Sequence, residues 1–492
     1  MNFKDKLNSV IKKKGFISLT IKYVASIAMV TILAVGTKIA FFYEPEINSL
    51  LVQPIVDRTE LEQTSVKGQK MSASIVEEGS VLLKNDNKTL PLNKEDTPKV
   101  NVFGWHSIDW IYGTGGDQVG SGGVLPEDDD FSKNIDLYDA LDDYGVEYNR
   151  DLYDMYHNYF KPFYLGRGLK VGKITDSNYL VEPDINDKNY YSDTLLNNAK
   201  SYSDTAIMVI SRLCGEGGSN PTNQPKEGPK GKTTDTSRHY LELSTEEESL
   251  LTYLGANFEN VIVLINNCNQ MELGLLETIP GIDAYMYVGY TGTRGASSLP
   301  KLLYGDATPS GRLVDTFAYD LHTNPSVIWN TPIWSSTDGS YLDKVAGIYI
   351  GYKWYETADA MGMWTAANGY EKGYEGVVQY PFGHGLSYTD FEWTIDDIKV
   401  DDVSVSKGAA IKEDSKIEFT VTVKNIGEIK GKDVVEIFGT APYINGEIEK
   451  SSVELVAYGK TNEIEPGASE TIKITVDMYD IASYDCYDKN NN

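Results

Sequence analysis

The sequence has 492 residues, which at roughly 150 residues per domain predicts two or three domains. Hydrophobic residues make up 41% of the chain, enough to bury sizeable cores. The net charge of −28, from 72 acidic and 44 basic residues, argues against nucleic acid as a partner, because a polyanion would repel the chain.

The N-terminal segment combines positive charge with a long apolar run. Residues 1–22 hold six lysines against one acidic residue, and residues 23–43 are apolar except for Lys38 and a few small polar side chains. Such a run can cross a bilayer about 30 Å thick if Lys38 reaches the headgroups. Lysines in front of it predict a cytoplasmic N-terminus and export of the rest of the chain. A signal peptide cleaved near residues 34–36 is the alternative.

We therefore expect a single-pass protein of the cell membrane with an extracytoplasmic globular part. The expected segments are a cytoplasmic basic tail (1–22), a transmembrane signal anchor (23–43) and a polar stalk (44–70).

From residue 71 onwards, short apolar strands alternate with amphipathic helices. This alternation predicts an α/β fold, with a mostly parallel sheet covered by helices on both faces. Gly145 is expected to end a helix, and Ser244 to Glu247 has the spacing of a capping box. A helix that runs into a short apolar strand is expected within 72–92. Further strands are expected within 100–104, 146–149, 204–211, 260–266 and 282–290, and further helices within 137–144, 244–258, 271–277 and 294–305.

Past residue 386 the helical pattern disappears. Residues 416–443 and 470–485 alternate apolar and polar side chains and contain glycine turn signals. Short strands without intervening helices predict an all-β sandwich. The sequence ends at "CYDKNNN", where one more strand would be expected, so we expect this sandwich to be incomplete.

One carboxylate stands at the exit of a buried strand. Glu216 lies in "SRLCGEGGS" (211–219), directly behind the apolar stretch "DTAIMVI". Ligands gather at the carboxyl ends of parallel strands, and flanking glycines let the backbone approach a ligand closely. The alternative is a solvated loop glutamate, the common fate of this residue type. Residues 112–123 form a glycine-rich loop at the same predicted edge, but the loop lacks the lysine of a phosphate-binding motif.

The cysteines and histidines show no spacing typical of a disulfide framework or a metal site. Three cysteines and five histidines are scattered along the chain, so the sequence predicts no disulfide framework, no metal site and no cofactor. Asp109 is interpreted as a loop or capping residue that follows the first strand of the predicted sheet.

Six stretches in order resemble the C-terminal half of glycoside hydrolase family 3, the β-glucosidase and β-xylosidase type. They span roughly residues 71–488. The stretches are "EEGSVLLKNDNKTLPL" (77–92), "GTGGDQVGSGGV" (113–124), "SRLCGEGGS" (211–219), "DTSRHYLELSTEEESLL" (235–251), "LLYGDATPSGRLVDTF" (302–317) and "YPFGHGLSYTDFE" (380–392).

The resemblance implies an α/β sandwich domain over 71–387, followed by a fibronectin type III-like domain over 388–492. It also implies a retaining hydrolase of O-glycosidic bonds, acting on an oligosaccharide or β-glucoside. Its S-G-E-G pattern falls on Glu216, which becomes the expected acid/base catalyst. The expected substrate-binding residues are Gly120, Ser121, Gly122 and Arg212.

In this family the nucleophile comes from a (β/α)₈ barrel domain, which needs roughly 250 residues. Only 70 residues precede the predicted sandwich. We therefore expect a member with reordered domains, whose barrel partner acts in cis or in trans and is absent from this chain. The isolated chain is then expected to have little activity. The alternative is a non-catalytic, membrane-anchored carbohydrate-binding or scaffold protein.

Overall fold

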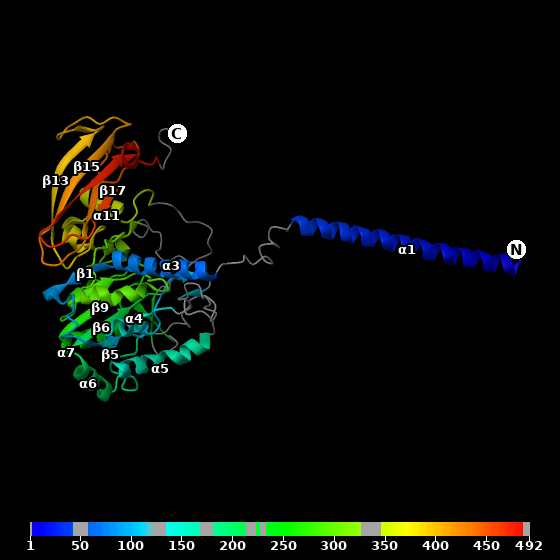
Figure 1. Ribbon diagram of the computed structural model, residues 1–492, viewed down its shortest axis with the longest axis horizontal. Helices are drawn as coiled ribbons and strands as arrows, with labels where there is room; N and C mark the ends of the chain where they lie inside the picture. The colour runs from blue at the N-terminus through cyan, green and yellow to red at the C-terminus, as the bar shows by residue number, and fades with distance from the viewer. Residues whose placement is uncertain are drawn as a thin grey trace. The chain divides into compact units, whose positions relative to one another are not determined.

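The computed structural model describes residues 2–42, 58–115, 118–119, 134–167, 181–212, 223–226, 233–325 and 346–485 (Figure 1). The chain divides into two compact units, Met1–Ser65 and Val66–Asn492, and each is described by itself.

In the first unit, helix α1 (Phe3–Phe42) takes up most of the segment expected to span a membrane. Within the described part of the chain, no helix has both the length and the apolar character needed to cross a bilayer. The Thr31 and Thr37 hydroxyls donate to carbonyls one turn earlier, and Lys38 is the one charged side chain among residues 23–42. The prediction of a single-pass cell-membrane location is therefore wrong, and the predicted transmembrane anchor over 23–43 and the membrane partner are not supported.

Helix α3 (Arg58–Gly79) occupies the later part of the expected stalk. Its second half belongs to the second unit, where Val76 is buried and the Ala73 carbonyl accepts a 2.8 Å hydrogen bond from Ser298 Oγ. Residues 58–70 are thus helical, since the helix expected from about residue 71 begins at Arg58.

A six-stranded sheet forms the centre of the second unit, as the alternation of apolar runs predicts (Figure 1). Its order is β1-β10-β9-β6-β2-β5, and all pairs are parallel except β1 with β10. Every residue of β6 is buried, as expected for a strand covered on both faces. The strands are β1 (Val81–Asn85), β2 (Lys99–Phe103), β5 (Glu147–Tyr148), β6 (Thr205–Ile210), β9 (Asn260–Ile265) and β10 (Ala284–Tyr287).

Helices cover both faces of this sheet. One hydrophobic cluster joins alternate strand residues such as Met208 and Val263 to helices α5, α6 and α7. The other joins Ile207 and Ile262 to α3, α4 and α9. The mostly parallel, doubly covered α/β fold is therefore confirmed. The helices are α4 (Leu137–Tyr144), α5 (Arg150–Arg167), α6 (Asp193–Tyr202), α7 (Thr245–Asn257), α8 (Gly274–Thr278) and α9 (Leu299–Tyr304).

Two local signals act as the sequence predicts. Gly145 ends α4 with φ of 77°, a left-handed conformation that favours glycine. Ser244 and Glu247 form a complete capping box at the start of α7.

Several short elements lie outside this core. The antiparallel pair β7–β8 lies between β6 and α7 along the chain, and β11–β12 lies near the end of the α/β region. Helix α11 places Trp354 and Tyr355 in a small separate core. The remaining elements here are η1 (Asp86–Lys88), η2 (Trp105–Ser107), β3 (Thr114–Gly115), β4 (Gln118–Val119), β7 (Asn223–Lys226), β8 (Thr233–His239), η3 (Gly295–Ser298), β11 (Phe317–Ala318), η4 (Leu321–Thr323), α11 (Tyr352–Ala360), η5 (Ala366–Asn368), η6 (Gly373–Gly376) and β12 (Val378–Tyr380).

Residues 391–477 form antiparallel sheets, as their alternating pattern predicts. A four-stranded sheet has the order β14-β13-β15-β18, and β16 pairs with β17. Side chains from both sheets, including Val423 of β15 and Val435 of β16, form one core. The elements are β13 (Phe391–Val400), β14 (Val403–Ser404), β15 (Lys416–Asn425), β16 (Val434–Gly439), β17 (Glu454–Lys460), β18 (Ser469–Asp477) and η7 (Met478–Ile481).

Candidate active site

The carboxyl edge of the six-stranded sheet is where the sequence places a site. Of the residues predicted to act there, Arg212 is described, two residues beyond the end of β6. Glu216, Gly120, Ser121 and Gly122 lie outside the described residues. The contacts of Arg212 and of its neighbours therefore define this edge.

Arg212 is buried and holds the exit of β6 against the start of α7. Its Nη1 and Nη2 donate to the two carboxylate oxygens of Glu247 at 2.8 and 2.6 Å. Its Nε donates to the Tyr240 carbonyl at 2.7 Å, and Nη2 also donates to the Glu242 carbonyl. Such a two-pronged pair fixes orientation as well as distance. The Arg212 guanidinium is thus a tie between three chain segments.

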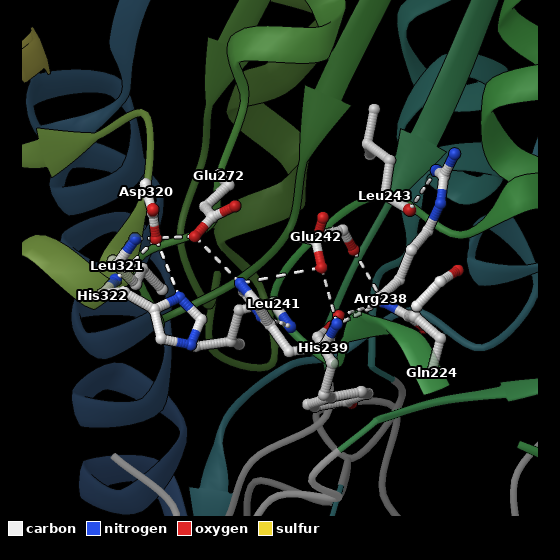
Figure 2. A network of polar contacts seen from close by, with 12 residues as sticks. Gln224, Arg238, His239, Leu241, Glu242, Leu243, Glu272, Asp320, Leu321 and His322 are labelled. Atoms are coloured by element: carbon white, nitrogen blue, oxygen red, sulfur yellow. Dashed lines mark hydrogen bonds and ion pairs between the residues drawn. The ribbon is translucent and has the colours of Figure 1, made fainter. Parts of the chain in front are cut away.

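Gln224 reinforces the same segment from the other side. Its Nε2 donates to the Tyr240 and Glu242 carbonyls at 2.8 and 2.7 Å. Together with Arg212 it fixes residues 239–242, from the last residue of β8 onwards. Figure 2 shows Gln224 near this segment. Sequence reasoning had no signal for Gln224, since the stretch around it is rich in glycine and proline.

Asn266, directly after β9, joins the loops at this edge. Its Oδ1 accepts from the Ile111 amide at 2.8 Å, and its Nδ2 donates to the Ile111 and Gly289 carbonyls at 3.0 and 2.8 Å. Ser211 Oγ donates to the Asn266 carbonyl at 2.5 Å. The side-chain amide and the backbone carbonyl of Asn266 therefore together tie the chain segments that follow β2, β6, β9 and β10.

A hollow of about 220 Å³ opens at the same edge. Burial raises the pKa of Asp315 in its wall above the usual value, against the hydrogen bond that the Thr316 amide donates. Ligand cavities commonly measure roughly 300–1,000 Å³, so this hollow alone is too small for an oligosaccharide. Its lining includes Cys268, Gln270, Tyr287, Arg312, Asp315 and Phe317.

Asp109 lies just after the 3₁₀ turn η2, where its amide donates to the Trp105 carbonyl at 3.3 Å. This position agrees with its interpretation as a loop residue, but the strand before it is β2, the second strand of the sheet along the chain.

The structure also contains a buried carboxylate that sequence reasoning missed. Glu182 Oε2 accepts from the Trp105 amide at 2.8 Å, and Oε1 accepts from the Tyr156 and Tyr191 hydroxyls at 3.1 and 2.7 Å. Burial raises the pKa of Glu182 to about 7, although these hydrogen bonds favour the charged form. The charge of Glu247 raises it further.

A second polar network lies beside the segment held by Arg212 (Figure 2). His239 Nε2 lies 2.9 Å from Glu272 Oε1, which also accepts from the Leu321 amide at 2.6 Å. Burial disfavours protonation of His239, but the Glu272 hydrogen bond and the charges of Glu272, Glu242 and Asp320 raise its pKa above the usual value. Sequence reasoning missed this network because its members are far apart along the chain.

Comparison with known proteins defines the class. The model of the glycosyl hydrolase family 3 C-terminal domain matches residues 80–388. Beta-glucosidase A of Butyrivibrio fibrisolvens is 30% identical over 88% of this chain and 48% of its own length. A beta-glucosidase of Ruminococcus albus is 31% identical over 84% of this chain and 36% of its own length.

Solved structures agree with these relatives. The crystal structure of a beta-glucosidase from Paenibacillus barengoltzii matches with a TM-score of 0.64 at 26% identity, over 86% of this chain and 40% of that one. The fold and these matches define a glycoside hydrolase domain. The chain belongs to glycoside hydrolase family 3. It spans less than half the length of the two curated beta-glucosidases from Butyrivibrio and Ruminococcus.

Proposed function

We propose that this chain supplies the acid/base half of a retaining β-glycosidase site. Glu216 protonates the leaving glycosidic oxygen and then takes a proton from the attacking water. A carboxylate nucleophile, about 5 Å away, comes from a (β/α)₈ barrel domain that acts in cis or in trans. The substrate class is β-glucosides or gluco-oligosaccharides, since the relatives from Butyrivibrio and Ruminococcus are beta-glucosidases.

The main support for the proposal is that hydrogen bonds hold Ser211 and Arg212, the two residues directly after β6, in place. A general acid works only if it is held within hydrogen-bonding reach of the leaving oxygen. Ser211 is bonded to Asn266, and Arg212 is bonded to Glu247 and to the backbone of residues 240 and 242. Glu216 follows four residues later, so its segment starts from a rigid base at the carboxyl edge of the sheet.

In this proposal Arg212 is a positioning residue as well as the substrate-binding residue expected from the sequence. Its guanidinium is bonded to Glu247 and to carbonyls, so any contact with the sugar would be additional. Gly120, Ser121 and Gly122 are proposed to bind the sugar through main-chain amides and the serine hydroxyl.

The domain assignment belongs to the same proposal. We assign residues 71–387 to the α/β sandwich domain of the family and 388–492 to a fibronectin type III-like domain. The two antiparallel sheets with their shared core support the second assignment.

The test joins this chain to a family 3 barrel domain and measures hydrolysis of an aryl β-glucoside. We expect hydrolysis by the fusion and none by the isolated chain. Glu216→Ala is expected to slow the fusion by roughly 10²- to 10⁴-fold. Azide should restore its turnover and yield the β-glucosyl azide, because an anionic nucleophile needs no general base.

Asp109→Asn is the matched control, since Asp109 lies at the same edge and has no proposed role in catalysis. Full activity of the Glu216→Ala fusion would refute the acid/base assignment. Vigorous turnover by the isolated chain would refute the need for a barrel. If calorimetry shows binding of gluco-oligosaccharides while the fusion stays inactive, the chain is a carbohydrate-binding protein instead.

A further inference from the structure

Two imidazoles and a carboxylate converge on one point beside the segment held by Arg212 (Figure 2). His239 is the last residue of β8, Glu272 follows β9, and His322 lies in η4. Each offers one ligand atom, and these atoms all lie within 4.8 Å of one another. Three separate parts of the chain thus contribute to the cluster.

The carboxylate of Glu272 is fixed at the centre. Its Oε1 lies 2.9 Å from His239 Nε2 and accepts from the Leu321 amide at 2.6 Å. The rings of His239 and His322 are 5.8 Å apart between centroids and meet edge to face. The Leu321 amide therefore holds the carboxylate of Glu272 in place, next to the His239 ring.

Negative charge accumulates around the two imidazoles. Besides Glu272, Asp320 Oδ1 lies 2.8 Å from His322 Nδ1, and Glu242 Oε2 lies 3.8 Å from His239 Nε2. The neighbouring Arg238 donates to the Leu243 carbonyl and to Glu248. With neutral imidazoles, the three carboxylates carry a charge of −3, and a divalent cation would neutralise two of these charges.

We propose that His239, Glu272 and His322 bind a divalent transition-metal ion, with Zn²⁺ as the first candidate and Asp320 within reach as a further ligand. Two imidazoles and a carboxylate suit borderline cations of this kind. Tetrahedral zinc ligands lie roughly 3.3 Å apart, given metal–ligand distances of about 2.0 Å. The present separations, from 2.9 Å up to 4.8 Å, bracket that value.

Small side-chain movements would bring the ligand atoms to metal-binding distances. The His322 and Asp320 side chains are 55% and 60% exposed, so they have room to move. Binding also has a cost, because the Leu241 amide lies 3.2 Å from His239 Nδ1 and donates to it. A metal on Nε2 requires the proton on Nδ1, so this contact is given up. The site is therefore expected to bind more weakly than a closed structural zinc centre.

The ion would brace the predicted active-site edge. Arg212 and Gln224 fix residues 239–242, and the metal would tie this segment to η4 through His322. The expected role is structural, with no part in the hydrolytic step.

The test uses the complete, tag-free chain after treatment with EDTA. Calorimetric titration with ZnCl₂ is expected to show one equivalent of bound metal, and Zn²⁺ is expected to raise the melting temperature. His322→Ala and Glu272→Gln should each lower the affinity at least about tenfold. His157→Ala is the matched control, because His157 is an exposed histidine on α5.

Co²⁺ distinguishes this site from the three cysteines. The expected spectrum has d–d bands without a sulfur-to-cobalt charge-transfer band. The proposal is overturned if no saturable binding occurs, if His322→Ala binds Zn²⁺ as the unaltered chain does, or if the cobalt spectrum shows thiolate ligation.

Discussion

Arg212 and Glu247 form a buried ion pair with two hydrogen bonds, at 2.8 and 2.6 Å. Glu247 also caps α7, because its Oε2 accepts from the Ser244 amide at 2.7 Å. One carboxylate therefore links the exit of β6 to the start of the next helix. This link makes the stability of the α/β domain and the position of the proposed catalytic segment depend on the same pair.

Replacing Arg212 by methionine should destabilise the protein by about 3–5 kcal/mol, because Glu247 would remain buried without its partner. Urea denaturation followed by circular dichroism measures the change. Lys188→Met is the control, since Lys188 pairs with Asp193 while both side chains are more than half exposed. That change should cost less than about 1 kcal/mol. Equal losses for the two variants would contradict the structural role of Arg212.

Glu182 should make stability fall as pH rises through the weakly acidic range. Its usual pKa of 4.5 is raised to about 7 in the folded protein. The folded state therefore binds the proton more tightly than the unfolded state does. The free energy of unfolding falls by roughly 3 kcal/mol as the pH rises from about 4.5 to 7. Denaturation at several pH values should show this loss in the unaltered chain.

Glu182→Gln removes the titrating group, so this part of the pH dependence should disappear. Glu147→Gln changes an exposed carboxylate and should leave the pH dependence as it is. A Glu182→Gln variant with the same pH profile as the unaltered chain would show that Glu182 does not titrate in this range.

Much of the fold follows from the sequence because its signals are local. The residues of β6 and β9 are continuous apolar runs, and Gly145 and the Ser244–Glu247 capping box mark helix ends. The order of the strands does not follow from local signals. For example, β1 pairs antiparallel with β10 at one edge of the sheet. That pairing depends on contacts between distant segments, which a local pattern does not encode.

The candidate site could likewise be predicted from the sequence only in part. The strand exit before Glu216 is visible as an apolar run followed by glycines. The roles of Asn266 and Gln224 are not visible, because each acts on backbone groups of other segments. The meeting of His239, Glu272 and His322 likewise arises only after the chain folds.

Asn266→Ala should loosen the loop that follows β2. The change leaves the Ile111 amide, its carbonyl and the Gly289 carbonyl without their partner on Asn266, at a cost of roughly 1–3 kcal/mol per buried group. Hydrogen exchange of the Ile111 amide should become at least tenfold faster, by the conversion of about 1.4 kcal/mol per factor of ten. Asn257→Ala, at an exposed position on α7, should leave this exchange unchanged.

Arg312 and Asp433 should couple the α/β domain to the antiparallel sheets. Arg312 Nη2 donates to Asp433 Oδ1 at 2.6 Å, and Trp393 Nε1 donates to the other carboxylate oxygen at 2.6 Å. Asp433→Ala removes both contacts, each worth about 1.5–3 kcal/mol as a hydrogen bond to a charged group. Because Asp433 directly precedes β16, exchange of the β16 amides should accelerate while that of the β9 amides stays slow. Lys473→Met breaks an exposed pair with Glu418 and should change neither. Equal acceleration in β9 and β16 would instead mean that the two parts unfold as one unit and that the pair is only one of many contacts between them.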